Sequence, residues 1–174
     1  PHPGGLSAAA GAAGGPGRYH GGMNTPALPV IQLKIERRSN HPWIFQKMVE
    51  KPAERPKPGS VVEIEDRDGT WCGRGFYNGH SRIALRVLTQ DPDEAVDAAF
   101  FARRLGRAIE LRRGALQLDA TTDAYRLVHS EGDELSGLVV DRFGDILVTE
   151  YFSAGMFRQR DVIRALAKAG ANLE

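Results

Sequence analysis

The chain has very little cysteine and no long apolar run. Cys72 is the only cysteine among 174 residues, which excludes an internal disulfide framework and a zinc site built from several cysteines. No stretch approaches the eighteen apolar residues that a membrane-spanning helix needs. The basic start and leucine-rich segment of a secretory signal are also missing from residues 1–22. We therefore expect a cytoplasmic protein without a membrane segment.

The chain also lacks a net charge of either sign, because 23 basic residues stand against 22 acidic ones. This balance excludes a uniformly basic tail for nucleic acid, but it conceals an uneven distribution. Residues 31–90 hold eleven basic and seven acidic side chains, a net charge of +4. Residues 91–174 hold eleven basic and fifteen acidic side chains, a net charge of −4. We expect an anionic partner to meet the basic front half.

The first residues contain almost nothing that can fill a core. Residues 1–22 include eight glycines, five alanines and three prolines, and Arg18 is their only charge. This composition predicts a disordered leader over residues 1–29, with structure beginning near Val30.

Short strands with glycine-rich turns are predicted in residues 30–90. Val62 and Ile64 alternate with Glu63 and Glu65, as in a strand that buries one face. With two similar segments, this pattern predicts a small β-barrel. The expected strands cover residues 61–65, 70–77 and 82–87, and residues 50–58, with three prolines, are expected to form a loop.

A helix and a small α+β unit are predicted in residues 91–174. Asp91 followed by Pro92 is typical of a helix start, and the helix is expected to end near Gly114 with Phe100 outside its main apolar stripe. The complete chain is therefore expected to have an α+β fold, a barrel followed by a helix and a β-β-β-α unit. Its later elements are strands over 125–129, 138–141 and 146–152, a hairpin turn over 141–145 and a helix over 155–169.

Two stretches carry a resemblance to a known family. The first joins Arg37–Phe45 to the later segments Pro58–Ile64, Gly73–Asn78 and Ser81–Ile83, and the second is Arg126–Asp145. Together they resemble the PUA domain and linker domain of bacterial 23S ribosomal RNA cytosine-5 methyltransferases, which use S-adenosylmethionine. The resemblance implies that residues 30–90 form a PUA-like RNA-binding barrel. It implies that residues 91–174 are the linker helix and the small α+β domain, and that a methyltransferase domain is absent from this chain.

The resemblance also implies what this fragment does and lacks. It would bind RNA, ribosomal RNA in particular, and would be inactive by itself. S-adenosylmethionine is expected as the cofactor of the full-length parent and no cofactor is expected here, because Gly73 and Gly75 have the wrong spacing and context for a dinucleotide turn. Cys72 is expected to be a packed small hydrophobe rather than a nucleophile. No catalytic or metal-binding residue is assigned.

The candidate RNA contacts combine cations for phosphates with an aromatic ring for a base. We expect them to form one face of the barrel. The set is Arg37, Arg38, His41, Lys47, Arg74, Tyr77, Asn78, Arg82 and Arg86. A solvated basic surface is the alternative for the arginines. Gly73 and Gly75 either let an RNA backbone approach or simply allow barrel curvature.

Two other functions remain open. Convergence of His129, Glu131 and Asp133 would make a self-contained metal-dependent or hydrolytic enzyme, although a turn explains these residues as well. Arg142 is expected to pair with Asp133 or Asp141. An exposed apolar face on the last helix would instead make the chain a protein-interaction module, which docks a partner or a second copy in a homodimer.

Overall fold

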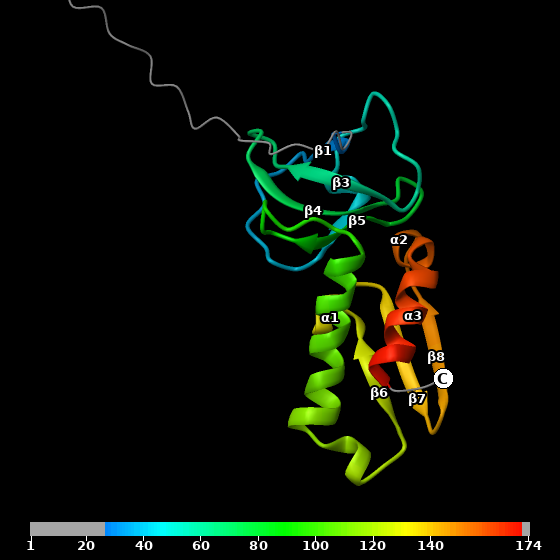
Figure 1. Ribbon diagram of the computed structural model, residues 1–174. Helices are drawn as coiled ribbons and strands as arrows, with labels where there is room; N and C mark the ends of the chain where they lie inside the picture. The colour runs from blue at the N-terminus through cyan, green and yellow to red at the C-terminus, as the bar shows by residue number, and fades with distance from the viewer. Residues whose placement is uncertain (1–26, 172–174) are drawn as a thin grey trace, which may run out of the picture.

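The computed structural model of the chain describes residues 27–171. The predicted leader, residues 1–29, lies almost entirely outside them. The front half folds into a five-stranded sheet in the order β1-β3-β4-β5-β2, in which only β1 and β3 run parallel (Figure 1). Its strands are β1 (Val30–Gln32), β2 (Trp43–Phe45), β3 (Ser60–Glu65), β4 (Trp71–Tyr77) and β5 (Ile83–Thr89).

The two edges of this sheet meet, which curls it into a half-barrel. Leu33, just after β1, pairs with Val49, just after the short helix η1 (Gln46–Met48) that follows β2. The amide of Lys34 donates to the carbonyl of Met48 at 2.8 Å. Strands β1 and β2 are three residues long, too short to show an alternating pattern, and for this reason the sequence did not reveal them.

Alternating apolar residues in β3 and a glycine in β4 account for the packing of the central strands of the barrel. Val62 and Ile64 of β3 are fully buried, which confirms the predicted strand. A side chain at Gly75 of β4 would overlap the carbonyl oxygen of Arg86 on β5. Gly75 therefore permits the close approach of β4 and β5, so the structure supports the interpretation that this glycine allows barrel curvature.

Helix α1 (Ala98–Glu110) leads from the barrel to the second unit. Its N-cap is Asp97, whose carboxylate accepts the amide of Phe100 at 2.8 Å. The expected start at Asp91 is wrong, because Asp97 supplies the cap and the residues before it form turns. Phe100 and Phe101 are both buried, with their rings edge to face at 5.3 Å, so the phenylalanine expected outside the main apolar stripe also packs in the core.

The second unit is a three-stranded antiparallel sheet with two helices. The strands are β6 (Ala124–His129), β7 (Leu138–Phe143) and β8 (Ile146–Tyr151), and the helices are α2 (Ala154–Arg158) and α3 (Arg160–Ala171). Gly144, at φ +58°, makes the predicted β7–β8 hairpin turn. The single helix predicted over 155–169 is interrupted at Gln159. Short helical turns fill the connections at η2 (Leu111–Ala115), η3 (Leu118–Ala120) and η4 (Ser130–Asp133).

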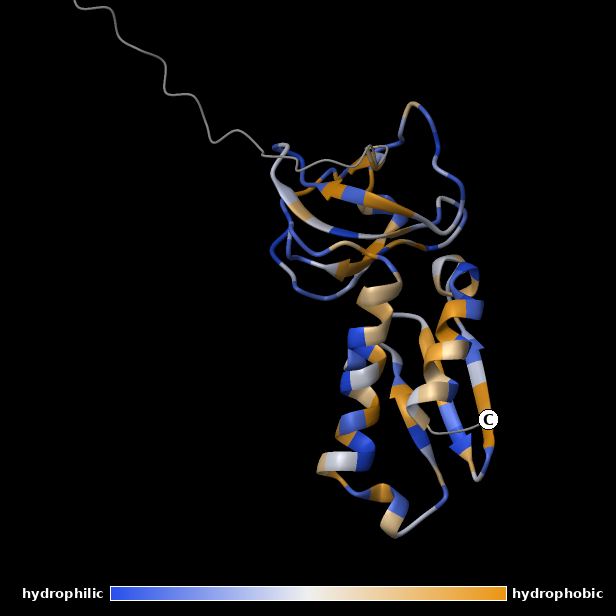
Figure 2. Ribbon diagram, in the orientation of Figure 1, coloured by the Kyte–Doolittle hydropathy of each residue, from blue (hydrophilic) through white to orange (hydrophobic). Residues whose placement is uncertain are grey.

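The apolar face of the last helix is covered. Ile163, Ala167 and Ala171 of α3 are at most 1% exposed, and α3 packs against α1. Figure 2 shows hydrophobic and hydrophilic residues alternating along both helices, as this packing requires. The expectation of an exposed apolar face on this helix is therefore wrong.

One hydrophobic core crosses the boundary between the barrel and the second unit. It joins Phe76 and Leu88 of the barrel to Leu105 of α1, Val140 of β7 and Met156 of α2. A separate core fills the barrel itself. The α+β fold class is thus confirmed. Among residues 27–171, no helix is long and apolar enough to cross a membrane.

Candidate nucleic-acid interface

Arg74 is held inside the molecule by its own acidic partner. Its side chain is 13% exposed, and its guanidinium donates to Glu63 at 2.7 and 3.0 Å. A further bond goes to the backbone carbonyl of Glu94, in the segment that leads to α1. Arg74 therefore ties β4 to β3 and to the linker, and its charge is already neutralised.

Arg86 belongs to a second internal group, which we call the Glu131 cluster: Trp43, Arg86, Glu131 and Ser136. The Arg86 guanidinium lies 5.2 Å from the centroid of the Trp43 ring and donates to Glu131 at 3.2 Å and to Ser136 at 3.0 Å. The indole nitrogen of Trp43 also donates to Glu131, at 2.7 Å. The cluster thus joins β2 and β5 of the barrel to the second unit.

The acidity of Glu131 reflects these contacts. Partial burial by itself would raise the pKa of this carboxyl, but hydrogen bonds from Ser130, Ser136 and Trp43 outweigh burial and lower the pKa to about 2. Glu131 is therefore a charged acceptor that holds other groups in place. A general acid at neutral pH would need its pKa shifted in the opposite direction.

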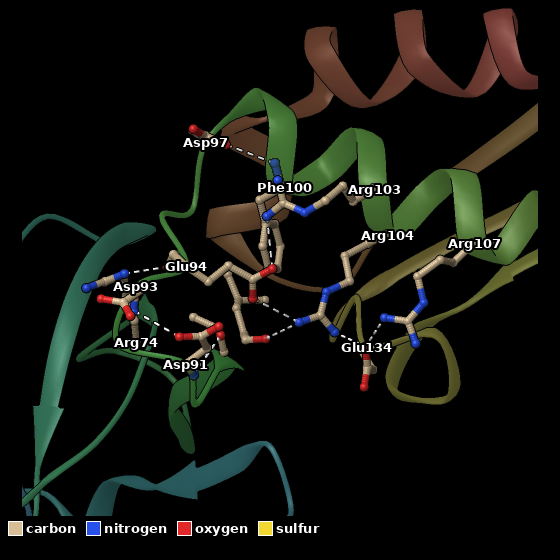
Figure 3. A network of polar contacts seen from close by, with 12 residues as sticks. Arg74, Asp91, Asp93, Glu94, Asp97, Phe100, Arg103, Arg104, Arg107 and Glu134 are labelled. Atoms are coloured by element: carbon tan, nitrogen blue, oxygen red, sulfur yellow. Dashed lines mark hydrogen bonds and ion pairs between the residues drawn. The ribbon is translucent and has the colours of Figure 1, made fainter.

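A third network fixes helix α1 to both units (Figure 3). Arg104, on α1, pairs with Glu94 at 3.2 Å and with Glu134, and its guanidinium lies 4.9 Å from the Phe100 ring centroid. Arg107 pairs with the same Glu134 at 3.1 Å. The charged members of this network, Glu94, Arg104, Arg107 and Glu134, line a cleft of about 570 Å³ between the barrel and α1. Its arginines are occupied by carboxylates, which makes it a poor site for phosphate.

Tyr77 is also unavailable to a base. It is 3% exposed and packs in the barrel core, with its hydroxyl against Gly79 of the β4–β5 turn. The expectation that Tyr77, Arg74 and Arg86 belong to an open RNA-binding face is not supported by their positions.

The six remaining candidates are divided along the length of β4. Arg37 lies beside Cys72 at the start of β4, and Arg82 lies in the turn that follows its end. A strand of seven residues rises by about 3.3 Å per residue, so roughly 20 Å separates the two regions. The six remaining candidates therefore lie near the two ends of β4, and one RNA-binding face that includes both ends stays a prediction.

The members of each region have different surroundings. Arg37 donates to the carbonyl of His41 at 2.9 Å, and Arg38 pairs with Glu36 at 2.8 Å. His41 lies edge-on to Trp43, with ring centroids 5.2 Å apart. Lys47, Asn78 and Arg82 lie at the opposite end, where the amide of Gln46 donates to the Arg82 carbonyl at 2.9 Å.

The end with the β4–β5 turn carries six exposed cations of the barrel. We call it the turn-end surface; its cations are Lys34, Lys47, Lys51, Arg55, Lys57 and Arg82. Each is exposed, and within the described part of the chain none of them takes part in an ion pair. Four of the six were absent from the predicted set. Three of these four lie in the proline-rich loop over 50–58, whose charges were visible in the sequence, but whose position beside the β4–β5 turn was not.

The acidic residues of the second unit do not converge. Asp133 binds Arg112 at 2.6 Å and accepts the amide of His129 at 2.5 Å, whereas Glu131 points to the Glu131 cluster. Residues 27–171 contain no group of three or more acids, histidines or cysteines that could hold a metal ion. The convergence predicted for a metal-dependent or hydrolytic enzyme is therefore wrong.

Arg142 and Cys72 differ in how they compare with the expectations from the sequence. Arg142 pairs with Asp119 at 2.9 Å rather than with Asp133 or Asp141, and Asp141 instead binds Arg126. Cys72 packs against the barrel core, and burial raises the pKa of its thiol. A nucleophilic cysteine needs the opposite shift.

Comparison with known proteins gives this fold a family context. The PUA-like domain family matches residues 35–90. Ribosomal RNA large subunit methyltransferase I of Aeromonas hydrophila is 46% identical over 123 residues, which make up 71% of this chain and 31% of the relative. Its Escherichia coli counterpart is 42% identical over 120 residues, or 69% and 30% of the two chains. The chain thus spans about a third of the length of the curated relatives it matches.

Solved structures agree with the fold. A protein from Streptococcus mutans, described as a SAM-dependent methyltransferase, matches 83% of this chain and 38% of its own, with a TM-score of 0.65 and 14% identity. A second, described as a methyltransferase in complex with SAH, has the same TM-score at 16% identity and matches 84% and 38% of the two chains. Such low identities establish the fold alone. Residues 35–90 therefore form a PUA-like domain, and over 71% of its length the chain is homologous to part of ribosomal RNA large subunit methyltransferase I.

Proposed function

We propose that this chain is the RNA-binding, N-terminal part of a SAM-dependent ribosomal RNA methyltransferase, and that the methyl-transfer domain lies outside its 174 residues. The observation that carries the proposal is the 46% identity to ribosomal RNA large subunit methyltransferase I over 123 residues, although the chain spans only 31% of that relative. The PUA-like domain and the unpaired cations of the turn-end surface support a role in binding RNA.

RNA binding and methyl transfer would belong to different parts of the parent protein. A class I methyltransferase holds its cofactor on a strand, a glycine-rich turn and a helix. The glycine-rich strand β4 is followed instead by the antiparallel strand β5, so it cannot serve as that unit. S-adenosylmethionine would therefore bind in the remainder of the parent, and this chain by itself would be inactive.

Methylation at carbon 5 of cytosine is the reaction we assign to the parent, in the cytoplasm. Attack on the base requires an activated thiolate, and the raised pKa of Cys72 argues against that role. The nucleophile would belong to the methyl-transfer domain. Bisulfite sequencing of large-subunit ribosomal RNA after deletion of the gene would test this assignment, because one protected cytosine should become convertible. The homodimer considered from the sequence has no support from the comparisons or from the described fold.

The binding proposal is tested by titrating a structured fragment of large-subunit ribosomal RNA with the chain, using fluorescence anisotropy at 50–200 mM salt. Binding should weaken steeply as salt increases. The double substitution Lys47→Gln and Arg82→Gln should reduce the slope of log K against log salt by roughly 2, since each lost phosphate contact changes it by about 0.9.

The matched control is Arg67→Gln with Lys168→Gln, which removes the same charge from the β3–β4 turn and from α3. It should leave the slope unchanged. Absence of salt-dependent binding by the unmodified chain would contradict the proposed function.

A further inference from the structure

The turn-end surface contains a pocket of about 230 Å³ that three separate segments enclose. Its floor is made of buried residues, Val49, Tyr77 and Ala84. Its rim carries three exposed cations, Lys34, Lys51 and Arg55, and one carboxylate, Glu50. The four charged groups on the rim give it a net charge of +2.

Hydrogen bonds to backbone carbonyl groups hold these walls in place. The amide of Glu50 donates to Gln32 at 2.9 Å, which fixes the start of the proline-rich loop to the end of β1. The side-chain amide of Gln46 donates to the carbonyl of Gly79 at 3.1 Å, which fixes η1 to the β4–β5 turn. The concave shape is therefore formed before any ligand binds, and only the cationic side chains remain free to adjust.

Size and charge together select the ligand. Cavities that hold drug-sized molecules or whole cofactors measure about 300–1,000 Å³, so this pocket suits a smaller group. Cations from two segments, Lys34 after β1 and Lys51 and Arg55 in the proline-rich loop, surround one concavity. This arrangement suits a phosphate, which accepts hydrogen bonds in several directions. Lys47, Lys57 and Arg82 continue the positive charge beyond the rim, which favours a chain of phosphates over an isolated anion.

We propose that this pocket receives one backbone phosphate of a single-stranded RNA segment, with its ribose against the apolar floor. The proposal rests on the proposed function and locates its main contact at Lys34, Lys51 and Arg55, none of which the sequence analysis had selected. A single strand is specified because its backbone can adapt to a concave site more readily than the regular backbone of a duplex.

The test compares two triple variants that lose the same charge. The pocket variant carries Lys34→Gln, Lys51→Gln and Arg55→Gln, and the control carries Arg67→Gln, Arg107→Gln and Lys168→Gln. Each is titrated with a single-stranded oligoribonucleotide and with its duplex over a range of salt. For the single strand, the pocket variant should lower the slope of log K against log salt by about 0.7, because the three cations neutralise one phosphate and each neutralised phosphate contributes about 0.7. The control should retain the slope of the unmodified chain.

A second measurement locates the contact. In the unmodified chain, the single strand should shift the backbone amide resonances of Gly79 and Ala84, and inorganic phosphate should compete for the same shift. Circular dichroism of each variant establishes that it is folded. Equal reductions of the salt slope in both triple variants would overturn the proposal for this pocket. Tighter binding of the duplex than of the single strand would overturn it as well.

The outcomes also separate this inference from the proposed function. If the pocket variant binds RNA as tightly as the unmodified chain, the proposal for the pocket is overturned and the proposed function is not affected. Phosphate shifts at Gly79 and Ala84 without any RNA binding would contradict the proposed function and, with it, the RNA ligand proposed for the pocket.

Discussion

At the scale of single residues, Glu131 connects the two halves of the chain. Its carboxylate accepts hydrogen bonds from Trp43, Arg86 and Ser136. Trp43 and Arg86 belong to the barrel, and Ser136 belongs to the turn before β7. A neutral acceptor would make weaker bonds to all three donors, so the charge itself contributes to stability.

We expect Glu131→Gln to lower the free energy of unfolding by about 1–2 kcal/mol at pH 7. The figure is that of a charged hydrogen bond, reduced because about a third of the side chain is exposed. Urea titrations of the variant and of the unmodified chain measure the difference. Glu54→Gln, in the exposed loop, is the control and should have no comparable effect.

The pH dependence of that difference follows from the lowered pKa. The pKa of Glu131 is about 2 in the folded chain against an ordinary 4.5, so the carboxylate stabilises the fold fully above about pH 5. This stabilisation decreases as the pH falls from 4.5 towards 2, because the carboxyl is protonated first in the unfolded chain and only at about pH 2 and below in the folded chain. The difference in the free energy of unfolding between Glu131→Gln and the unmodified chain should therefore decrease over that range. A difference that stays constant down to pH 2 would contradict the lowered pKa of Glu131.

At the scale of elements, two glycines in helices have opposite roles. Gly155, in α2, lies against the ring of Phe76, and a Cβ added there would overlap the ring. Gly106, in α1, has open space around it. The first glycine lets α2 pack onto the barrel, whereas the second only adds backbone freedom to the unfolded chain.

These positions form a matched pair of Gly→Ala substitutions. Gly155→Ala should lower the free energy of unfolding by about 1–3 kcal/mol, because the core must shift to accept the methyl group. Gly106→Ala should raise it by about 0.5–1 kcal/mol, because alanine favours a helix over glycine. Urea unfolding followed by circular dichroism measures both. A change of the same sign in the two variants would contradict this account of α2.

At the scale of the whole molecule, the barrel and the second unit share a core. Phe76 and Leu88 of the barrel pack in the same cluster as Leu105, Val140 and Met156. The Glu131 cluster and the Arg104 network add polar contacts between the two units. The orientation of the barrel relative to the second unit is therefore part of the folded structure.

We expect the two units to unfold in one cooperative transition. Trp43 and Trp71 are the only tryptophans and both lie in the barrel, so their fluorescence reports its unfolding. The helical signal in far-ultraviolet circular dichroism comes mainly from α1, α2 and α3, outside the barrel. The two probes should give the same urea midpoint. Separate midpoints would indicate that the shared core does not couple the units.

The elements were largely predictable because their signals are local. The alternation around Val62, the turn at Gly144 and the apolar stripe of α1 each depend on residues within a few positions of one another. The start of α1 was misplaced because both Asp91 and Asp97 are plausible caps, and packing of Phe100 and Phe101 decided between them. Strands as short as β1 and β2 exist only because neighbouring strands receive their hydrogen bonds.

The candidate site was less predictable because the pairing of charges is a long-range property. Residue types and their local spacing were enough to establish that the front half is basic, that it builds a barrel of short strands and that a hairpin unit follows. Which of its cations are free depends on the folded arrangement of the chain. Arg86 meets Glu131 from 45 positions away, and Arg74 meets the Glu94 carbonyl from 20. The strength of an ion pair depends on the distance between the two charges, and folding sets that distance. The sequence therefore does not distinguish an arginine that binds a carboxylate from one that is free to bind a phosphate.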